Sequence, residues 1–259
     1  MILRERQDRI VTALRSNGSA SVKQLAEELD VSEATIRRDL QLLDANGELS
    51  RTWGGAVLRP GLTVPAKGDD AELEGPFAQY ADFDNKSRIA RAAADLVTDD
   101  SVIILDIGTV TPLIAKHLHG RNITVITSNL AVFDELRDDE AVRLILLGGV
   151  VRRNYRTLVG SLTELGLAQI SADMLFLSCT GVRPSGHVVD NMAVEAPIKQ
   201  SMIAGADKVV LLASEVKFPG TGALRLCSLS DVDVLITTEG APEETLKHCR
   251  EAGGEVTIV

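Results

Sequence analysis

Aromatic residues, cysteines and long apolar segments are all scarce in this chain of 259 residues. Phe, Trp and Tyr make up 3% of the sequence, with a single Trp and two Tyr among them. So few large rings argue against a stacking surface for single-stranded nucleic acid, and the cores must be built from Val, Leu, Ile and Ala. No segment approaches the ~18 consecutive apolar residues of a membrane-spanning helix, so we expect no membrane partner.

The three cysteines, Cys179, Cys227 and Cys249, are odd in number, lie far apart and include no Cys-x-x-Cys pair. That pattern predicts reduced thiols in a cytoplasmic protein rather than a disulfide framework or a zinc site. The four histidines form no ligand spacing with them. The opening segment MILRERQDRI alternates charged and apolar residues, unlike a signal peptide. We therefore expect no metal and a cytoplasmic location.

The formal net charge of -10 is distributed unevenly along the chain. It argues against a protein that coats nucleic acid by bulk electrostatics, but a small DNA-reading module on an acidic body remains open. Residues 1–60 contain nine Lys and Arg and nine Asp and Glu, so the whole excess falls on the remainder. This asymmetry predicts two domains.

Residues 3–58 predict three short helices followed by a hairpin. The first helix ends at Asn17–Gly18, a common helix stop. Ser21 and Ser32 are expected to cap the second and third helices, and the third runs to about Ala45. The segment ELSRTWGGAVL predicts two short strands around Gly54–Gly55. The residues expected in the core of the first two helices are Ile10, Val11, Leu14, Val22, Leu25 and Leu29.

The third helix is predicted to have one buried and one outward face. At 100° per residue, Leu40 and Leu43 fall within about 40° of Ile36, so these three form the core stripe. A helix this short gains little stability alone and must dock on the first two. The side chains left facing outward together are Thr35, Arg37, Arg38 and Gln41.

This arrangement predicts a helix-turn-helix whose second helix enters the major groove of DNA. Arg bridges phosphates or recognises guanine there, and Gln recognises adenine. The Ser32 end of the helix offers backbone N–H groups to a phosphate, and Arg51 on the hairpin is expected to contact the DNA as a wing. Trp53 is expected to pack the wing onto the helices. The alternative is an ordinary solvated helix face, where Arg pairs are common.

The segment RPGLTVPAKGDDAELEGPF, within residues 59–78, lacks any apolar period and predicts a linker. Beyond it, in residues 79–259, continuous Val/Ile/Leu runs alternate with helical patterns, which predicts an open α/β domain with a parallel sheet covered on both faces. The predicted strands are SVIILD, ITVIT, RLILLGG, MLFLSC, KVVLLA, DVLITT and EVTIV.

The loop after the first of these strands is a candidate anion cradle. Asp106 ends the strand, Gly108 makes a tight turn, and Thr109 and Thr111 supply hydroxyls where the next helix begins. Backbone N–H groups and the positive end of the helix dipole favour an anion there. The loop has neither the GxGxxG nor the Walker pattern, so we expect no dinucleotide or ATP cofactor. The alternative is a loop that only turns the chain.

Three later segments add candidates. Ser128 and Asn129 follow the second strand and Gly149 follows the third, and loops at the carboxyl ends of parallel strands line one crevice. Simple helix caps are the alternative. Glu195 and Lys199 lie four residues apart on one helix, which an ordinary surface ion pair explains. Lys217 lies after another strand, where it can meet a phosphate or carboxylate.

The stretch LAEELDVSEATIRRDLQLLDANGELSRTWGGAV resembles the winged helix-turn-helix of the DeoR family of bacterial transcription regulators. The most specific parts are the run from Ser32 to Leu40 and the Gly-Gly-Ala after the wing. This resemblance implies that the first domain binds operator DNA.

Residues of about 80 to 240 resemble the DeoR sensor domain. The marks are Lys86 within NKSRIARAAADLV, then DIGT, TSNL, LLGG, TGV with Gly186, EAPIKQSM and VKF. The resemblance implies a fold similar to ribose-5-phosphate isomerase and glucosamine-6-phosphate deaminase, and a phosphorylated sugar as ligand. Val110 and Ser214 depart from the family pattern, which usually has Thr and Asp there. The expected effector-binding residues are Lys86, Asp106, Gly108, Thr109, Thr111, Ser128, Asn129, Gly149, Glu195, Lys199 and Lys217.

These features together favour a metabolite-responsive transcription regulator, expected to be a repressor of a carbohydrate-metabolism operon. Because the DNA reader is small and has no basic excess, we expect a homo-oligomer, either a dimer or a tetramer. The rival hypothesis is a sugar-phosphate isomerase or deaminase with an accessory DNA-binding domain. Asp106, Glu195 and Lys217 are conceivable acid or base groups, but no motif marks any of them as catalytic. An architectural DNA binder would leave the α/β domain without a role.

Overall fold

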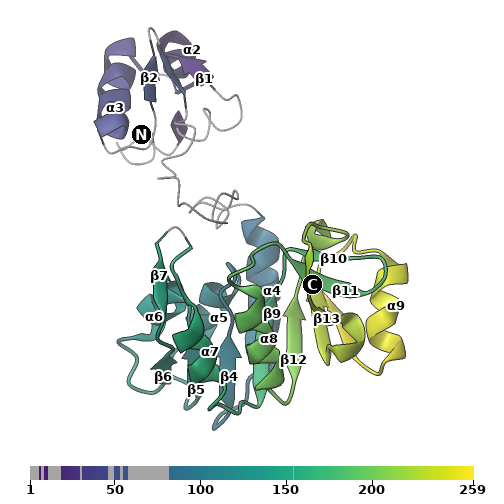
Figure 1. Cartoon of the computed structure of the whole chain (residues 1–259). Helices are drawn as coiled ribbons and strands as arrows, with labels where there is room; N and C mark the ends of the chain where they lie inside the picture. The colour runs from purple at the N-terminus through teal and green to yellow at the C-terminus, as the bar shows by residue number, and fades with distance from the viewer. Residues whose placement is uncertain are drawn as a thin grey trace. The chain divides into compact units, whose positions relative to one another are not determined.

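The computed structural model describes residues 6, 9–10, 19–29, 31–45, 50–52, 55–57, 82–153 and 155–259. The chain divides into two units, residues 1–71 and 72–259 (Figure 1). The predicted linker, Trp53 and most of the predicted first helix lie outside the described residues.

Two helices of the first unit occur where the sequence predicts them. Helix α2 spans Val22–Leu29 and helix α3 spans Glu33–Ala45. Ser21 Oγ accepts a hydrogen bond of 3.2 Å from the backbone N–H of Gln24, and Ser32 Oγ caps α3 in the same way. These caps satisfy donors that the first turn of a helix leaves unpaired. The core they enclose comprises Ile10, Val22, Leu25, Ala26, Leu29, Ile36, Leu40, Leu43 and Ala56.

A three-stranded antiparallel sheet completes the described part of the first unit. Strands β2 (Ser50–Thr52) and β3 (Gly55–Val57) form the predicted hairpin. Thr52 pairs with Gly55, so Gly55, which was predicted to lie in the turn, is the first residue of β3. Strand β1 (Ser19–Ser21) pairs with β3 and was not predicted, because three small residues carry no apolar alternation.

Seven parallel strands form the sheet of the second unit, as predicted. They are β4 (Val102–Leu105), β5 (Thr124–Thr127), β6 (Arg143–Leu146), β9 (Met174–Ser178), β12 (Val209–Leu212), β14 (Val234–Thr237) and β15 (Glu255–Ile258). Every neighbouring pair is parallel, and the order across the sheet is β15-β14-β12-β9-β4-β5-β6.

Helices cover both faces of this sheet (Figure 1). Along strand β4, Ile103 and Leu105 pack into one apolar core and Ile104 packs into the other, because successive strand residues point to opposite faces. The first core also contains residues of α4 (Phe83–Asp95), α5 (Thr111–His117) and α6 (Leu130–Leu136). The second contains residues of α7 (Ser161–Leu167), α8 (Ala196–Ala204) and α9 (Glu243–Glu251).

The chain reverses its direction across the sheet between β4 and β9. From β4 it proceeds through β5 to β6, whereas β9, β12, β14 and β15 follow one another on the other side. In open parallel sheets, ligands bind beyond the carboxyl ends of the strands at such a reversal. The loops that follow β4 and β9 are therefore where a ligand is expected in this fold.

Several short elements of the second unit were not predicted from the sequence. Strands β7 (Val150–Arg152) and β8 (Thr157–Val159) form an antiparallel hairpin. A second small sheet contains β10 (Gly181–Val182), β11 (His187–Asp190) and β13 (Leu224–Ser228), and two 3-10 turns are η1 (Glu215–Lys217) and η2 (Leu229–Asp231). These elements are too short to carry a recognisable apolar period.

Candidate DNA-reading surface and effector site

The outward face of α3 has the composition that its periodicity predicts. Arg37, Arg38 and Gln41 are exposed and Thr35 is half-buried, whereas the core stripe on the opposite side is at most 1% exposed. The helix therefore presents two guanidinium groups and an amide on one free surface. Such a face matches the donors and acceptors of the major groove.

The two arginines of this face differ in their contacts. Arg37 donates to Glu33 one turn earlier over 2.8 Å, and both side chains are exposed. Such a pair stabilises the helix by a few tenths of a kcal/mol, so a phosphate can displace it. The guanidinium group of Arg38 forms no hydrogen bond or ion pair with the described residues. The backbone of Arg51 pairs with Ala56 in the hairpin, and its side chain lies outside the described set.

A buried ion pair that the sequence analysis missed holds α3 in place. Asp39 is 2% exposed and accepts hydrogen bonds from Arg6 Nε at 2.5 Å and Arg6 Nη2 at 3.3 Å. The hydrogen bond with Asp39 raises the pKa of Arg6. The available signal was an aspartate between Ile36 and Leu40, next to the buried stripe, where an unpaired charge is costly.

Asp106 joins the two strands at the reversal of the sheet. It is 0% exposed, and its Oδ1 accepts from the backbone N–H of Ile107 at 2.6 Å. Its Oδ2 accepts from the backbone N–H and the hydroxyl of Ser178 at 2.9 and 2.5 Å. Because Ser178 ends β9, this carboxylate fixes the spacing between the loops that follow β4 and β9.

The loop that follows Asp106 is held by a compact hydrogen-bond network. Thr111 Oγ1 donates to the carbonyls of Asp106 and Gly108, at 2.6 and 2.9 Å. Asn129 Nδ2 donates to the Gly108 carbonyl and to Thr111 Oγ1, each at 3.2 Å. A Cβ on Gly108 would lie 2.4 Å from Ser178 Cβ, so only glycine fits between the strands. Thr111 and Asn129 thus shape the loop with their own polar atoms.

Two hydroxyls near this loop remain available. Thr109 is half-buried, and its hydroxyl bonds to none of the described residues. Ser128 Oγ is fully buried and likewise finds no hydrogen-bond partner in the described structure. Leaving a buried hydroxyl unpaired costs about 1–3 kcal/mol, and such a group in a native protein points to a bound water or ligand.

Lys199 lies at the centre of a buried charge cluster, so its interpretation as half of a surface ion pair with Glu195 was wrong. It is 3% exposed, and Nζ donates to Asp190 at 2.8 Å and to the Ser178 carbonyl at 3.1 Å. Asp106 Oδ2 is 3.4 Å away. Burial lowers the pKa of Lys199, but the surrounding carboxylates outweigh it and raise the pKa above its ordinary value. Spacing along the helix did not reveal these partners, because they lie on or next to strands that are distant in sequence.

Glu195 pairs instead with Arg152 of the β7–β8 hairpin. The guanidinium of Arg152 also lies over the ring of Tyr155, 4.1 Å from its centroid. Burial raises the pKa of Glu195 to about 7, although Lys199 and Arg152 oppose the rise. The sequence analysis missed Arg152 because nothing in its local pattern indicates burial.

The remaining predicted effector residues lie at the same end of the strands. Lys217 is half-buried in η1 after β12, and its ammonium group forms no hydrogen bond or ion pair with the described residues. Burial raises the pKa of the Cys179 thiol to about 11, and the positive charges of Lys199 and Lys217 oppose this rise.

Lys86 and Gly149 are two further predicted effector residues. Lys86 is half-buried in the first turn of α4, beside Asn85, whose amide donates to Glu215 of η1 over 3.4 Å. Gly149 follows β6, and a Cβ there would lie 2.4 Å from Thr163 Oγ1. Close packing against α7 therefore accounts for this glycine.

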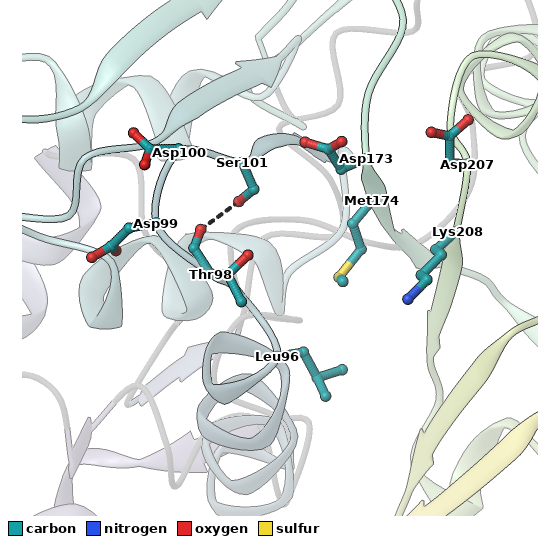
Figure 2. Close-up of a pocket in the computed structure, with 9 residues that line it drawn as sticks. All are labelled: Leu96, Thr98, Asp99, Asp100, Ser101, Asp173, Met174, Asp207 and Lys208. Carbon is teal, nitrogen blue, oxygen red and sulfur yellow. Dashed lines mark hydrogen bonds between the residues drawn. The ribbon is translucent and has the colours of Figure 1, made fainter.

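A pocket of about 460 Å³ opens at the opposite end of the sheet (Figure 2). Its lining includes Asp99, Asp100, Asp173 and Asp207, with Lys208 as the one cation. The first three carboxylates already accept hydrogen bonds from Arg121, Asn122 and the backbone of Val102. Because an acidic wall repels phosphate, this pocket does not suit the predicted ligand.

Neither a membrane-spanning helix nor a metal cluster occurs among the described residues. No helix among them is long and apolar enough to cross a membrane. In the same residues, no group of three or more His, Cys, Asp or Glu side chains is placed to hold a metal ion.

Comparison with known families and proteins gives matches over most of the chain. The model described as the DeoR C terminal sensor domain matches residues 82–239, and the DeoR-like helix-turn-helix domain matches residues 6–59. The HTH-type transcriptional regulator GolR of Listeria innocua is 32% identical and covers 98% of each chain. The L-fucose operon activator of Haemophilus influenzae is 30% identical over 95% of this chain and 96% of its own.

The HTH-type transcriptional repressor GlcR of Bacillus subtilis is 31% identical over 92% of this chain and 89% of its own. Among solved structures, ribose 5-phosphate isomerase A from Methanocaldococcus jannaschii is 18% identical, with a TM-score of 0.39, over 52% of this chain and 54% of its own.

Proposed function

This chain belongs to the DeoR family of DNA-binding transcriptional regulators, and we propose that it represses a carbohydrate-metabolism operon under the control of a phosphorylated sugar. The observation that carries the proposal is the division of α3, whose arginine pair is exposed while Ile36, Leu40 and Leu43 are buried. One relative is named as a repressor and another as an operon activator. Repression, rather than activation, is therefore part of the proposal.

In the proposed complex, α3 lies in the major groove and the hairpin contacts the backbone. Arg38, which no described residue pairs with, recognises a base edge or a phosphate. Arg37 breaks its ion pair with Glu33 and contacts the DNA instead. Ser32 and Thr35 lie at the helix start, where backbone N–H groups favour a phosphate, and Gln41 extends the same face.

The proposed effector site is the crevice at the reversal of the sheet. Thr109 and Ser128 supply hydroxyls, and Lys217 supplies a cation for the phosphate. Asp106 and Lys199 act beneath the ligand, because their polar atoms are committed to each other and to Ser178 and Asp190. They fix the positions of the loops that the ligand contacts.

The proposed regulator works as a homo-oligomer, with paired recognition helices about one DNA turn apart. The ligand shifts the population between DNA-competent and DNA-incompetent arrangements, which requires that it bind the two with different affinities. A repressor of this kind releases the operator when the sugar phosphate accumulates.

Replacement of Arg38 tests the DNA-reading surface. The probe is a duplex selected from random sequence by the wild-type protein. Arg38→Ala is expected to weaken binding to this duplex tenfold or more, at about 1–3 kcal/mol per lost contact, in a gel shift at fixed salt. Arg91→Ala, which removes an exposed arginine from α4, is the matched control. Equal affinity of Arg38→Ala and wild type would contradict the assignment of α3.

A thermal-shift screen tests the effector site. Ribose 5-phosphate, glucosamine 6-phosphate and other sugar phosphates are compared with their unphosphorylated parents. A stabilising phosphate is expected to lose its effect in the double variant Thr109→Val with Lys217→Gln, while binding to the selected duplex persists. A shift as large as in wild type would place the ligand elsewhere. Turnover of either sugar phosphate at ordinary enzyme rates would favour the rival isomerase or deaminase.

A further inference from the structure

A concentration of exposed apolar side chains marks one side of the second unit. Of the eleven large hydrophobic residues that are exposed in the described structure, six fall between residues 145 and 165. Their exposed fractions run from 37% to 69%. The members of this 145–165 surface are Ile145, Leu146, Val150, Val151, Leu162 and Leu165.

The 145–165 surface surrounds an open edge of the sheet. Strand β6 is the last in the strand order, and no described strand pairs with its outer side. Leu144 packs into the core beneath α4 to α6, so Ile145 points to the opposite face, where α7 lies. On α7, Leu162 and Leu165 are one turn apart and exposed, while Thr163 and Leu167 are buried.

The start of β7 belongs to the same surface. A Cβ on Gly149 would touch Thr163 of α7, and a Cβ on Gly160 would lie 4.0 Å from Val150 Cγ2. The three apolar elements are therefore neighbours in space as well as in sequence. Exposed apolar patches above a few hundred Å² are rare on monomers and mark contact surfaces.

The opposite edge of the sheet is different. Strand β15 exposes Glu255 and Ile258 at its two ends, and its two central residues are half-buried. A charged residue on an edge strand discourages pairing with other strands. On β6 the one charge, Arg143, stands at the first position and leaves Leu144–Leu146 uninterrupted.

We propose that the 145–165 surface is a two-fold contact with a second copy of this chain. In this contact β6 pairs antiparallel with β6 of the partner, and the sheets of the two copies become continuous. A two-fold axis perpendicular to the sheet keeps the same face up in both copies, so α7 packs beside α7 of the partner. This single two-fold contact supplies hydrogen-bond partners to the free N–H and C=O groups of β6 and buries the apolar side chains around the strand.

Size favours a second copy as the occupant. The six side chains expose on the order of several hundred Å² together, a large share of the ~800 Å² per partner of a standard interface.

This inference rests on the proposed function for its purpose, since paired recognition helices need paired subunits, but its test uses neither DNA nor sugar. Light scattering after size exclusion measures the mass of the full chain at micromolar concentration. Wild type is expected at a mass of two subunits or more, and Leu162→Glu with Leu165→Glu at a lower mass. Ile258→Glu, an exposed residue on the other edge, is expected to leave the mass unchanged.

A single-subunit mass for wild type, or an unchanged mass for a double variant with wild-type circular dichroism, would overturn the proposal.

A crosslinking experiment decides the case in which the double variant does not fold. The three native cysteines are buried, so Ile145→Cys introduces the accessible thiol. A short bis-maleimide is expected to link it to the same residue of a second copy but to leave Ile258→Cys as a single chain. Crosslinking no stronger than that of Ile258→Cys would overturn it.

Discussion

Glu195 shows at the residue scale how its surroundings change a side chain. A surface glutamate on a helix stays ionised at neutral pH, but burial raises the pKa of this one to about 7. A carboxyl whose pKa is higher in the folded than in the unfolded chain binds its proton more tightly when folded. The stability it contributes is therefore present below about pH 4.5, its ordinary pKa, and is lost as the pH rises through 7.

This linkage predicts an unusual effect of Glu195→Gln. The variant is expected to match wild type near pH 4.5 and to be more stable at pH 8, by about 3 kcal/mol if the full shift is realised. Urea unfolding followed by far-UV circular dichroism at both pH values measures the difference. Glu251→Gln, at an exposed position, is the matched control in the same measurement. Parallel pH profiles of wild type and Glu195→Gln would disprove the raised pKa.

At the scale of elements, the loop between β4 and α5 depends on contact with β9. Asp106 bonds to both polar groups of Ser178, and Gly108 lies directly against the same residue. One residue of β9 thus sets the shape of a loop that is 70 positions earlier in sequence. Any substitution that separates the two strands should deform the proposed effector site.

Gly108→Ala tests this dependence. Its new Cβ would lie 2.4 Å from Ser178 Cβ, and such overpacking costs typically about 1–3 kcal/mol. Thermal unfolding is expected to show destabilisation by Gly108→Ala and little change for Gly148→Ala, where nothing lies within 4 Å. The double variant Gly108→Ala with Ser178→Gly is expected to lose less stability than the sum of the two single changes. Simple additivity would show that the clash does not limit the loop.

At the scale of the whole molecule, the acidic charge of -10 leads us to expect that tight DNA binding requires cooperation between subunits. A single reader with a few cations has weak affinity at physiological salt. Two readers joined through the second unit gain from an effective concentration that a lone reader lacks. The proposed contact through the 145–165 surface and the proposed operator binding are therefore coupled energetically.

The coupling predicts that Leu162→Glu with Leu165→Glu weakens operator binding without touching the DNA-reading surface. Gel shifts compare a duplex with two half-sites and a duplex with one. The loss is expected to be on the order of 10²-fold for two half-sites and negligible for one. A variant that keeps the wild-type preference for two half-sites would show that the subunits join elsewhere.

The sequence by itself determined the elements whose pattern is local. The 3.6-residue period places Ile36, Leu40 and Leu43 inside and the arginine pair outside, and continuous aliphatic runs predict the seven parallel strands. Each of these features depends on residues within one helix or strand. The loops after β4, β5 and β12 also follow from the sequence, because parallel strands end at one edge.

Only the tertiary structure decided which distant residues meet. Lys199 and Glu195 share a helix but bond to Asp190 and Arg152 on other elements, and Asp39 meets Arg6 from the start of the chain. The open edge at β6 likewise depends on the strand order. Local periodicity fixes which way a side chain faces, whereas strand order and crossovers fix what it faces, and these are set by the free energy of the whole packed core.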